Sequence, residues 1–334
     1  MGRAVSEPDS IAIVTVVMNR TRHLLSTAPQ VSQWSAHAEH LIIDWSSTTP
    51  VDPALLPDDS RIRLIRVDGE SQWQLARAYN FAMARAQAEV ILKLDADCWI
   101  TQVQSPWSAL KSGHYRRYAA PSGGLNGLFM IRRSDFFAVG GFNEYLTGYG
   151  FDDKDLYQRL DERLDVEPLE SGLFQTLDHD DLDRVSANDR ARPRLFSSLM
   201  IPRLGRWRAL RAIARMEETK AINRFLAESL PWSSLAPSSV YQEIGPDHWR
   251  LIPETRPRLP EPVQTRASDL GNRLYLSCIL GLPERFLEMH VTAGQLAQIR
   301  RWDLFLNLQA MVRTYTLLVL LRFGLALSRR LPRC

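Results

Sequence analysis

A short apolar segment that runs directly into two aspartates constrains the fold of this chain more than any other feature. Residues 90–94 (Val-Ile-Leu-Lys-Leu) have the length and composition of a buried strand in a parallel sheet. Asp95 and Asp97 follow at once, and parallel strands place ligand-binding groups at their carboxyl ends. Because side chains alternate along an extended chain, both carboxylates are expected on one side, where they can approach a single divalent cation.

The Asp-x-Asp pattern by itself is weak evidence, because it also occurs at residues 153/155, 178/180 and 181/183. Two features distinguish the pattern at Asp95 and Asp97. It follows a predicted buried strand, and a second acidic cluster at residues 140–156 lies about one small subdomain downstream. Taken together, these features indicate a metal site.

Strand-like and helix-like segments alternate through the first half of the chain. Residues 11–18, 40–44 and 61–67 predict strands, and residues 21–35 predict a helix between the first two. Residues 71–88 carry apolar side chains at helical spacing and are expected to pack on the sheet. This order predicts a doubly wound α/β domain that binds its ligands at the strand ends.

The second half of the chain has a different composition. Residues 204–230 and 266–331 are predicted to be helical, and a Pro-rich stretch at residues 231–262 connects them. We therefore predict two domains: an α/β domain at residues 1–196 and a mainly helical accessory region at residues 197–334. The sequence does not decide whether the accessory region binds a substrate, a membrane or a partner.

Composition narrows the class of protein. The 334 residues are 45% hydrophobic with a net charge of +3, as in ordinary globular proteins. The many arginines lack interleaved aromatic residues, which predicts no nucleic-acid partner. The three cysteines show no metal or redox spacing, and no signal sequence is visible. We therefore predict a cytoplasmic location.

A membrane-peripheral location is the alternative, and it rests on one apolar stretch near the end of the chain. Residues 315–327 are interrupted by Arg322 and are too short to span a bilayer. Two interpretations stay open for this stretch: a packed C-terminal helix, or a helix that makes peripheral contact with an anionic membrane surface.

Several motifs together resemble those of the GT-A glycosyltransferases, over roughly residues 11–185. Residues 140–143 (Gly-Gly-Phe-Asn) and 148–155 (Gly-Tyr-Gly-Phe-Asp-Asp-Lys-Asp) are similar to the hallmark of the C-terminal catalytic region of β-1,4-galactosyltransferases, which shares this region with family 2 enzymes. Residues 77–82 resemble the family's helix with an Arg-Ala and a following Asn, and residues 17–20 resemble its first nucleotide-contacting loop.

Two departures from the family pattern leave the transferred sugar open. Tyr149 stands where these galactosyltransferases have Trp, and Asp152 stands where they have Glu. The geometry of the acceptor site therefore cannot be carried over directly.

The resemblance implies a Rossmann-like GT-A domain with a doubly wound mixed sheet, followed by the helical region. It also implies a metal-dependent, inverting hexosyltransferase that moves a sugar from a nucleotide-sugar, here a UDP-sugar, to a hydroxyl of a glycan or glycoconjugate. The cofactor implied is Mn²⁺ or Mg²⁺, which suits oxygen ligands with one imidazole. The implied metal ligands are Asp95, Asp97 and His179. For His179, an exposed loop histidine is the equal alternative.

The remaining site residues follow from the same resemblance. Inversion needs one general base on the acceptor side, and the residue at that position is Asp153, with Asp152 binding the acceptor; an exchange of the two roles stays open. The donor contacts implied are Asn19, Arg20, Asp44, Arg77 and Asp95. The plainer alternatives are a loop cap for Asp44 and a solvated helix residue for Arg77. For the whole chain, the alternative is a non-catalytic sugar-nucleotide-binding or scaffold protein.

Overall fold

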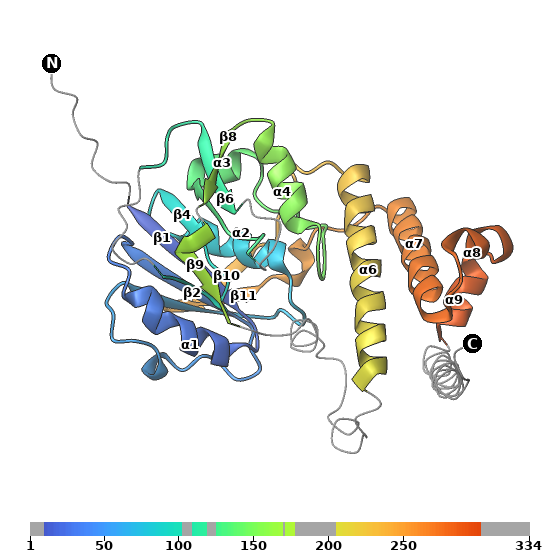
Figure 1. The fold of residues 1–334 in the computed structure, drawn as a ribbon, viewed down its shortest axis with the longest axis horizontal. Helices are drawn as coiled ribbons and strands as arrows, with labels where there is room; N and C mark the ends of the chain where they lie inside the picture. The colour runs from blue at the N-terminus through green and yellow to red at the C-terminus, as the bar shows by residue number, and fades with distance from the viewer. Residues whose placement is uncertain (1–9, 102–108, 119–124, 170, 178–204, 302–334) are drawn as a thin grey trace, which may run out of the picture. The chain divides into compact units, whose positions relative to one another are not determined.

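The structure is a computed structural model that describes residues 10–101, 109–118, 125–169, 171–177 and 205–301 (Figure 1). The chain divides into two compact units. The first contains residues Met1–Arg192 and Leu226–Leu259, and the second contains Pro193–Phe225 and Pro260–Cys334.

A nine-stranded mixed sheet forms the centre of the first unit, with the strand order β10-β11-β3-β2-β1-β4-β7-β6-β8. The four strands β3, β2, β1 and β4 run parallel, and β7 is antiparallel to β4. A separate small sheet pairs β5 with β9. The strands are β1 (Ile11–Val17), β2 (Glu39–Trp45), β3 (Ile62–Asp68), β4 (Val90–Lys93), β5 (Cys98–Ile100), β6 (His114–Tyr118), β7 (Phe129–Arg132), β8 (Asp165–Leu169), β9 (Phe174–Thr176), β10 (Tyr241–Gly245) and β11 (His248–Leu251).

Helices cover both faces of this sheet. The alternating side chains of β1 show the division: Val14 and Val16 pack in one core cluster with Ala78 of α2, whereas Val17 packs in another with Leu24 of α1. Helices α3 and α4 contribute to the same cluster as α2. The helices are α1 (Thr21–Ser32), α2 (Leu75–Arg85), α3 (Arg133–Ala138) and α4 (Asp152–Asp161), with short 3-10 turns at Pro53–Leu55, Ser171–Leu173 and Pro253–Thr255. The predicted doubly wound α/β class is therefore confirmed.

The Pro-rich stretch at residues 231–262 is more than the predicted connection between helices. It contains β10 and β11, and β11 joins the sheet parallel to β3. The hairpin is held by Arg85 of α2, whose guanidinium lies 3.5 Å from the ring centre of Phe81 and 3.8 Å from that of Trp249. Residues Leu226–Leu259 accordingly belong to the first compact unit. The limit at residue 196 and the assignment of the accessory region stay predictions.

The second unit is helical in the part that the structure describes. It contains most of α6 (Gly205–Ser229), together with α7 (Glu261–Leu280), α8 (Glu284–His290) and α9 (Ala293–Arg301). Tyr275 and Leu276 are at the centre of its core, and Arg300 forms an ion pair with Glu218. Among the described residues, no helix is long and apolar enough to cross a membrane. The apolar stretch at residues 315–327 lies outside the described part.

Candidate active site

The first acidic motif lies at the carboxyl end of β4, an interior strand of the sheet. Ile91 of β4 packs in the cluster that contains α2 and α4, so strand alternation directs Lys93 and Asp95 toward the same helices. Asp95 Oδ1 accepts a hydrogen bond of 2.8 Å from Lys93 Nζ and one of 2.9 Å from the Tyr79 hydroxyl. The Asp95 carboxylate is thereby oriented from the strand and from α2.

Asp97 lies beside the loop that follows β1. The guanidinium of Arg20 is 3.7 Å from Asp97 Oδ2, and both side chains are largely buried. Asn19 has a left-handed backbone, with φ of 58°. Its backbone N–H donates to Ser47 Oγ, and its own Oδ1 accepts from the Thr48 N–H. The loops after β1, β2 and β4 therefore meet at one edge of the sheet, as the sequence predicted for parallel strands.

The second acidic motif begins helix α4. Phe151, the residue before the helix, has a left-handed backbone with φ of 74°. That conformation is costly for a bulky residue, and such strain clusters at functional sites. It turns Asp152 and Asp153 into the first turn of α4, where the helix macrodipole favours carboxylates. Tyr149, in the loop before it, is 39% exposed.

Other residues of the motifs at 77–82 and 148–155 form contacts that stabilise the neighbouring backbone. Asp155 pairs with Arg159 at 2.6 Å, and Arg159 donates to the carbonyl oxygens of Val139 and Gly141. Asn80 of α2 accepts a hydrogen bond from the Phe142 N–H and donates to its carbonyl oxygen. These contacts connect α2 and α4 to the turn at residues 140–143.

The two acidic motifs meet at Lys93. A Cβ atom added to Gly127 would lie 3.0 Å from Lys93 Nζ and 3.0 Å from Asp153 Oδ2, so both atoms border the same point. Burial, together with the negative charge of Asp153, raises the pKa of Asp152 to about 7. Burial also raises the pKa of Asp153, and the Lys93 ammonium opposes that rise. Two poised carboxylates thus face the end of β4.

The donor set at the end of β4 fits a divalent cation shared with a ligand. Asp95 and Asp97 supply carboxylate oxygens, the ligands that Mg²⁺ and Mn²⁺ prefer, and such sites use one or two carboxylates plus substrate phosphates. Within the described residues, no group of three or more His, Cys, Asp or Glu side chains could hold a metal ion, so substrate phosphates would have to supply further ligands. His179, the third predicted ligand, lies outside the described residues.

Two predicted donor contacts are engaged inside the protein. Asp44 is 1% exposed and accepts hydrogen bonds from the Ser47 and Val51 N–H groups and from Arg66, as expected for a loop cap. Arg77 is buried and forms a two-point ion pair with Glu70, at 2.9 and 2.7 Å. The solvated alternative predicted for Arg77 is therefore wrong, and its donor role stays a prediction.

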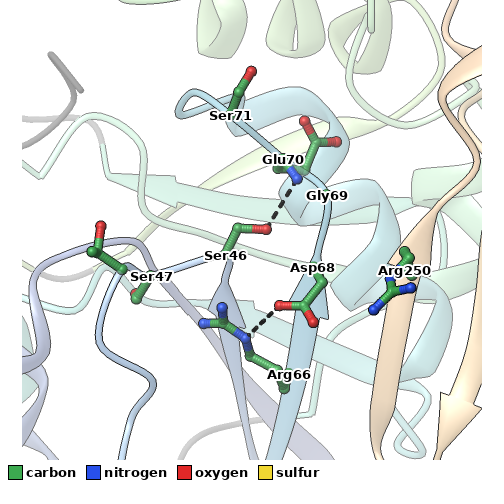
Figure 2. A pocket seen from close by; sticks show the side chains of 9 residues that line it. Ser46, Ser47, Arg66, Asp68, Gly69, Glu70, Ser71 and Arg250 are labelled. Atoms are coloured by element: carbon green, nitrogen blue, oxygen red, sulfur yellow. Dashed lines mark hydrogen bonds and ion pairs between the residues drawn. The ribbon is translucent and has the colours of Figure 1, made fainter. Parts of the chain in front are cut away.

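A polar pocket of about 700 Å³ opens beyond the ends of β2 and β3 (Figure 2). Its floor is fixed by the hydrogen bond from the Glu70 N–H to Ser46 Oγ and by the ion pair between Arg66 and Asp68. Sequence reasoning missed this pocket, because Arg250 comes from the distant β11. The local signals were polar residues that follow two predicted strands: Ser46, Ser47 and Thr48 after one, and Asp68 with Gly69 after the other. The lining residues are Ser46, Ser47, Thr48, Arg66, Asp68, Gly69, Glu70, Ser71 and Arg250.

Comparison with known proteins confirms the resemblance predicted from the motifs. Residues 108–180 match the family model described as the N-terminal domain of galactosyltransferase. This segment contains the turn at residues 140–143 and both Asp152 and Asp153. No curated protein matches the sequence. The chain is similar to nucleotide-sugar glycosyltransferases of the GT-A type.

Solved structures similar to this chain include two of Drosophila β1,4-galactosyltransferase 7. One, of the catalytic domain with xylobiose, has 15% identity, covers 51% of this chain and 71% of its own, and gives a TM-score of 0.40. The other, of a mutant with manganese, UDP-Gal and xylobiose, has 13% identity, coverage of 57% and 79%, and a TM-score of 0.42. A mannosyltransferase from Pyrobaculum calidifontis with GDP-Man and Mn²⁺ has 13% identity, coverage of 92% and 87%, and a TM-score of 0.42.

Proposed function

We propose that this protein is a metal-dependent, inverting glycosyltransferase that moves a hexose from a UDP-sugar to a hydroxyl of a glycan or glycoconjugate. The observation that carries the proposal is the meeting of two acidic motifs at one point. Asp95, at the end of a central strand, and Asp153, at the start of α4, both approach Lys93. A site with a metal-binding motif on one side and a poised carboxylate on the other suits displacement at a sugar carbon.

The donor side of the proposed site is the edge formed by β1, β2, β3 and β4. Asp97, with Asp95, would hold the divalent cation, which when bound neutralises charge on the departing diphosphate. The pocket after β2 and β3 is a polar hollow of suitable chemistry for a nucleoside, with serine hydroxyls and the charged groups of Asp68 and Arg250. Arg20, beside Asp97, would contact the phosphates.

The acceptor side is the first turn of α4. Asp153 would remove the proton from the attacking hydroxyl, since its raised pKa brings a carboxylate closer to the pH at which general bases work best. Asp152, with a pKa raised to about 7, would hydrogen-bond the acceptor sugar and hold it in place. Tyr149, exposed in the preceding loop, borders the same side.

The test is release of nucleoside diphosphate from a panel of sugar nucleotides, with Mn²⁺ or with chelator. We expect slow, metal-dependent hydrolysis of one donor, abolished in Asp97→Ala and retained in Asp58→Asn, which removes an exposed carboxylate far from the motifs. The active donor would also identify the sugar.

The opposite result is equally informative. If no donor is hydrolysed and none shifts the thermal unfolding of the protein, the transferase proposal is wrong. A thermal shift by one donor without hydrolysis, even with a range of sugar acceptors, would favour the alternative of a non-catalytic sugar-nucleotide-binding protein.

A further inference from the structure

Lys93 is a buried cation in a strand that otherwise carries apolar side chains. Its side chain is 1% exposed, and burial of an ammonium group is unfavourable unless carboxylates and hydrogen bonds compensate its charge. A methionine or leucine would fill the same space without this cost. The charge at this position therefore calls for a reason other than packing.

One side of Lys93 faces the first acidic motif. Its Nζ lies 2.8 Å from Asp95 Oδ1 and 4.5 Å from the centre of the Tyr79 ring. The Tyr79 hydroxyl donates to the same oxygen at 2.9 Å. Asp95 Oδ1 is thus held by two donors from two elements, which fixes the carboxylate at the end of β4 and leaves Oδ2 for another partner.

The other side of Lys93 faces the second motif. Asp153 Oδ2 and Lys93 Nζ both border Gly127, where a side chain would contact the two at once. Asp153 Oδ1 is buried and has no hydrogen-bond partner in the structure. A buried carboxylate oxygen without a donor is unfavourable, and an acceptor hydroxyl would satisfy it.

We propose that Lys93 is a positioning residue, whose ammonium joins the donor-side carboxylate of Asp95 to the acceptor-side carboxylate of Asp153 and holds both in place for transfer. It touches neither substrate in this arrangement. The expected effect of Lys93 on sugar transfer rests on the proposed function. The charge coupling among Lys93, Asp95 and Asp153 does not depend on it. The two parts can therefore be tested separately.

A thermal double-mutant cycle tests the coupling without any turnover. Lys93→Met is compared in the wild-type background and in the Asp95→Asn/Asp153→Asn background. Loss of the cation from beside two carboxylates should lower Tm by about 5 °C or more in the first background. In the second background, the loss should be less than half as large. Equal losses in both backgrounds would overturn the proposal, since the lysine would then only fill space.

The kinetic test compares kcat and KM of Lys93→Met with those of Lys111→Met, which removes a 70% exposed lysine. We expect kcat to fall by about 10-fold or more in Lys93→Met, while KM for the donor changes by less than about 3-fold. Lys111→Met should match wild type. A change in KM alone would contradict a role in joining the two carboxylates.

The pH profile separates charge from shape. The groups facing Asp153 are Lys93 from β4 and Asp95 from the loop after it, together with Asp152 and Tyr157 from α4. Lys93 is the cation among them, so its removal should raise the pKa of Asp153 and move the acid limb of kcat to higher pH. A uniform loss at every pH would oppose the proposal. If wild type turns over no donor, the proposed function fails while the thermal cycle still decides the coupling.

Discussion

Carboxylates at the two ends of this sheet edge differ in how far nearby cations compensate their charge. Beyond β2 and β3, the buried or half-buried acids of the described structure pair with arginines: Asp44 and Asp68 with Arg66, and Glu70 with Arg77 and, at 3.5 Å, with Arg256. At β4 and α4, Lys93 faces the three carboxylates of Asp95, Asp152 and Asp153. Compensated acids hold loops together, whereas the excess negative charge at β4 and α4 suits a cation or a proton. Burial raises the pKa of Asp152 and of Asp153 there.

The sharpest test of this contrast is Asp153→Asn against Asp155→Asn. Removal of a general base should lower kcat by about 10³-fold, with donor affinity unchanged. Asp155→Asn should instead lower Tm, because Arg159 loses its ion pair. Kinetics and thermal unfolding of both variants measure this. Equal loss of kcat in the two would break the distinction between them.

On the compensated side, the largest expected effect is on stability. Arg77→Met leaves Glu70 as a fully buried carboxylate and should cost about 3 kcal/mol in free energy of unfolding, measured by urea denaturation. Adding Glu70→Gln should recover part of the loss, because it removes a buried charge that only Arg256, at 3.5 Å, would still balance among the described ion pairs. If the single variant is as stable as wild type, the pair is not structural, and the predicted role of Arg77 toward the donor becomes the better explanation.

The acid group at α4 should also reverse the usual pH dependence of a paired carboxylate. The folded-state pKa of Asp152 is about 7, above its ordinary value of 3.8. The stability that protonated Asp152 contributes is therefore complete below about pH 4 and is lost as the pH rises through 7. Asp152→Asn stays neutral, so its Tm should gain on wild type as the pH rises from 4 to 8. A constant difference across this range, measured with chelator, would show that Asp152 is not perturbed.

The smallest expected effect is at the pocket. Arg250 is exposed at its rim, on β11, where a charged contact is worth about 0.5 kcal/mol. Arg250→Gln should therefore raise KM for the donor about 2-fold to 3-fold and leave kcat unchanged. An unchanged KM would place the nucleoside elsewhere along the edge.

Much of the fold could be predicted because its signals are local. The β4 segment was found from five consecutive residues, and the strands near residues 11–18, 40–44 and 61–67 from their branched apolar side chains. The hairpin of β10 and β11 was missed, because its sequence has no alternating apolar pattern. Three consecutive residues of β10, Gln242, Glu243 and Ile244, are exposed. Its membership in the sheet depends on pairing with β3 and on the distant Arg85.

By itself, the sequence determined the α/β class, the strand that ends at Asp95 and the two acidic motifs, since periodicity and motif spacing are properties of neighbouring residues. Only the tertiary structure decided which charged groups form ion pairs with other residues of the protein. It paired Asp44 and Arg77 with partners of their own, and it brought Lys93 between Asp95 and Asp153. Charge compensation depends on distance in space, and chain order does not encode that distance directly.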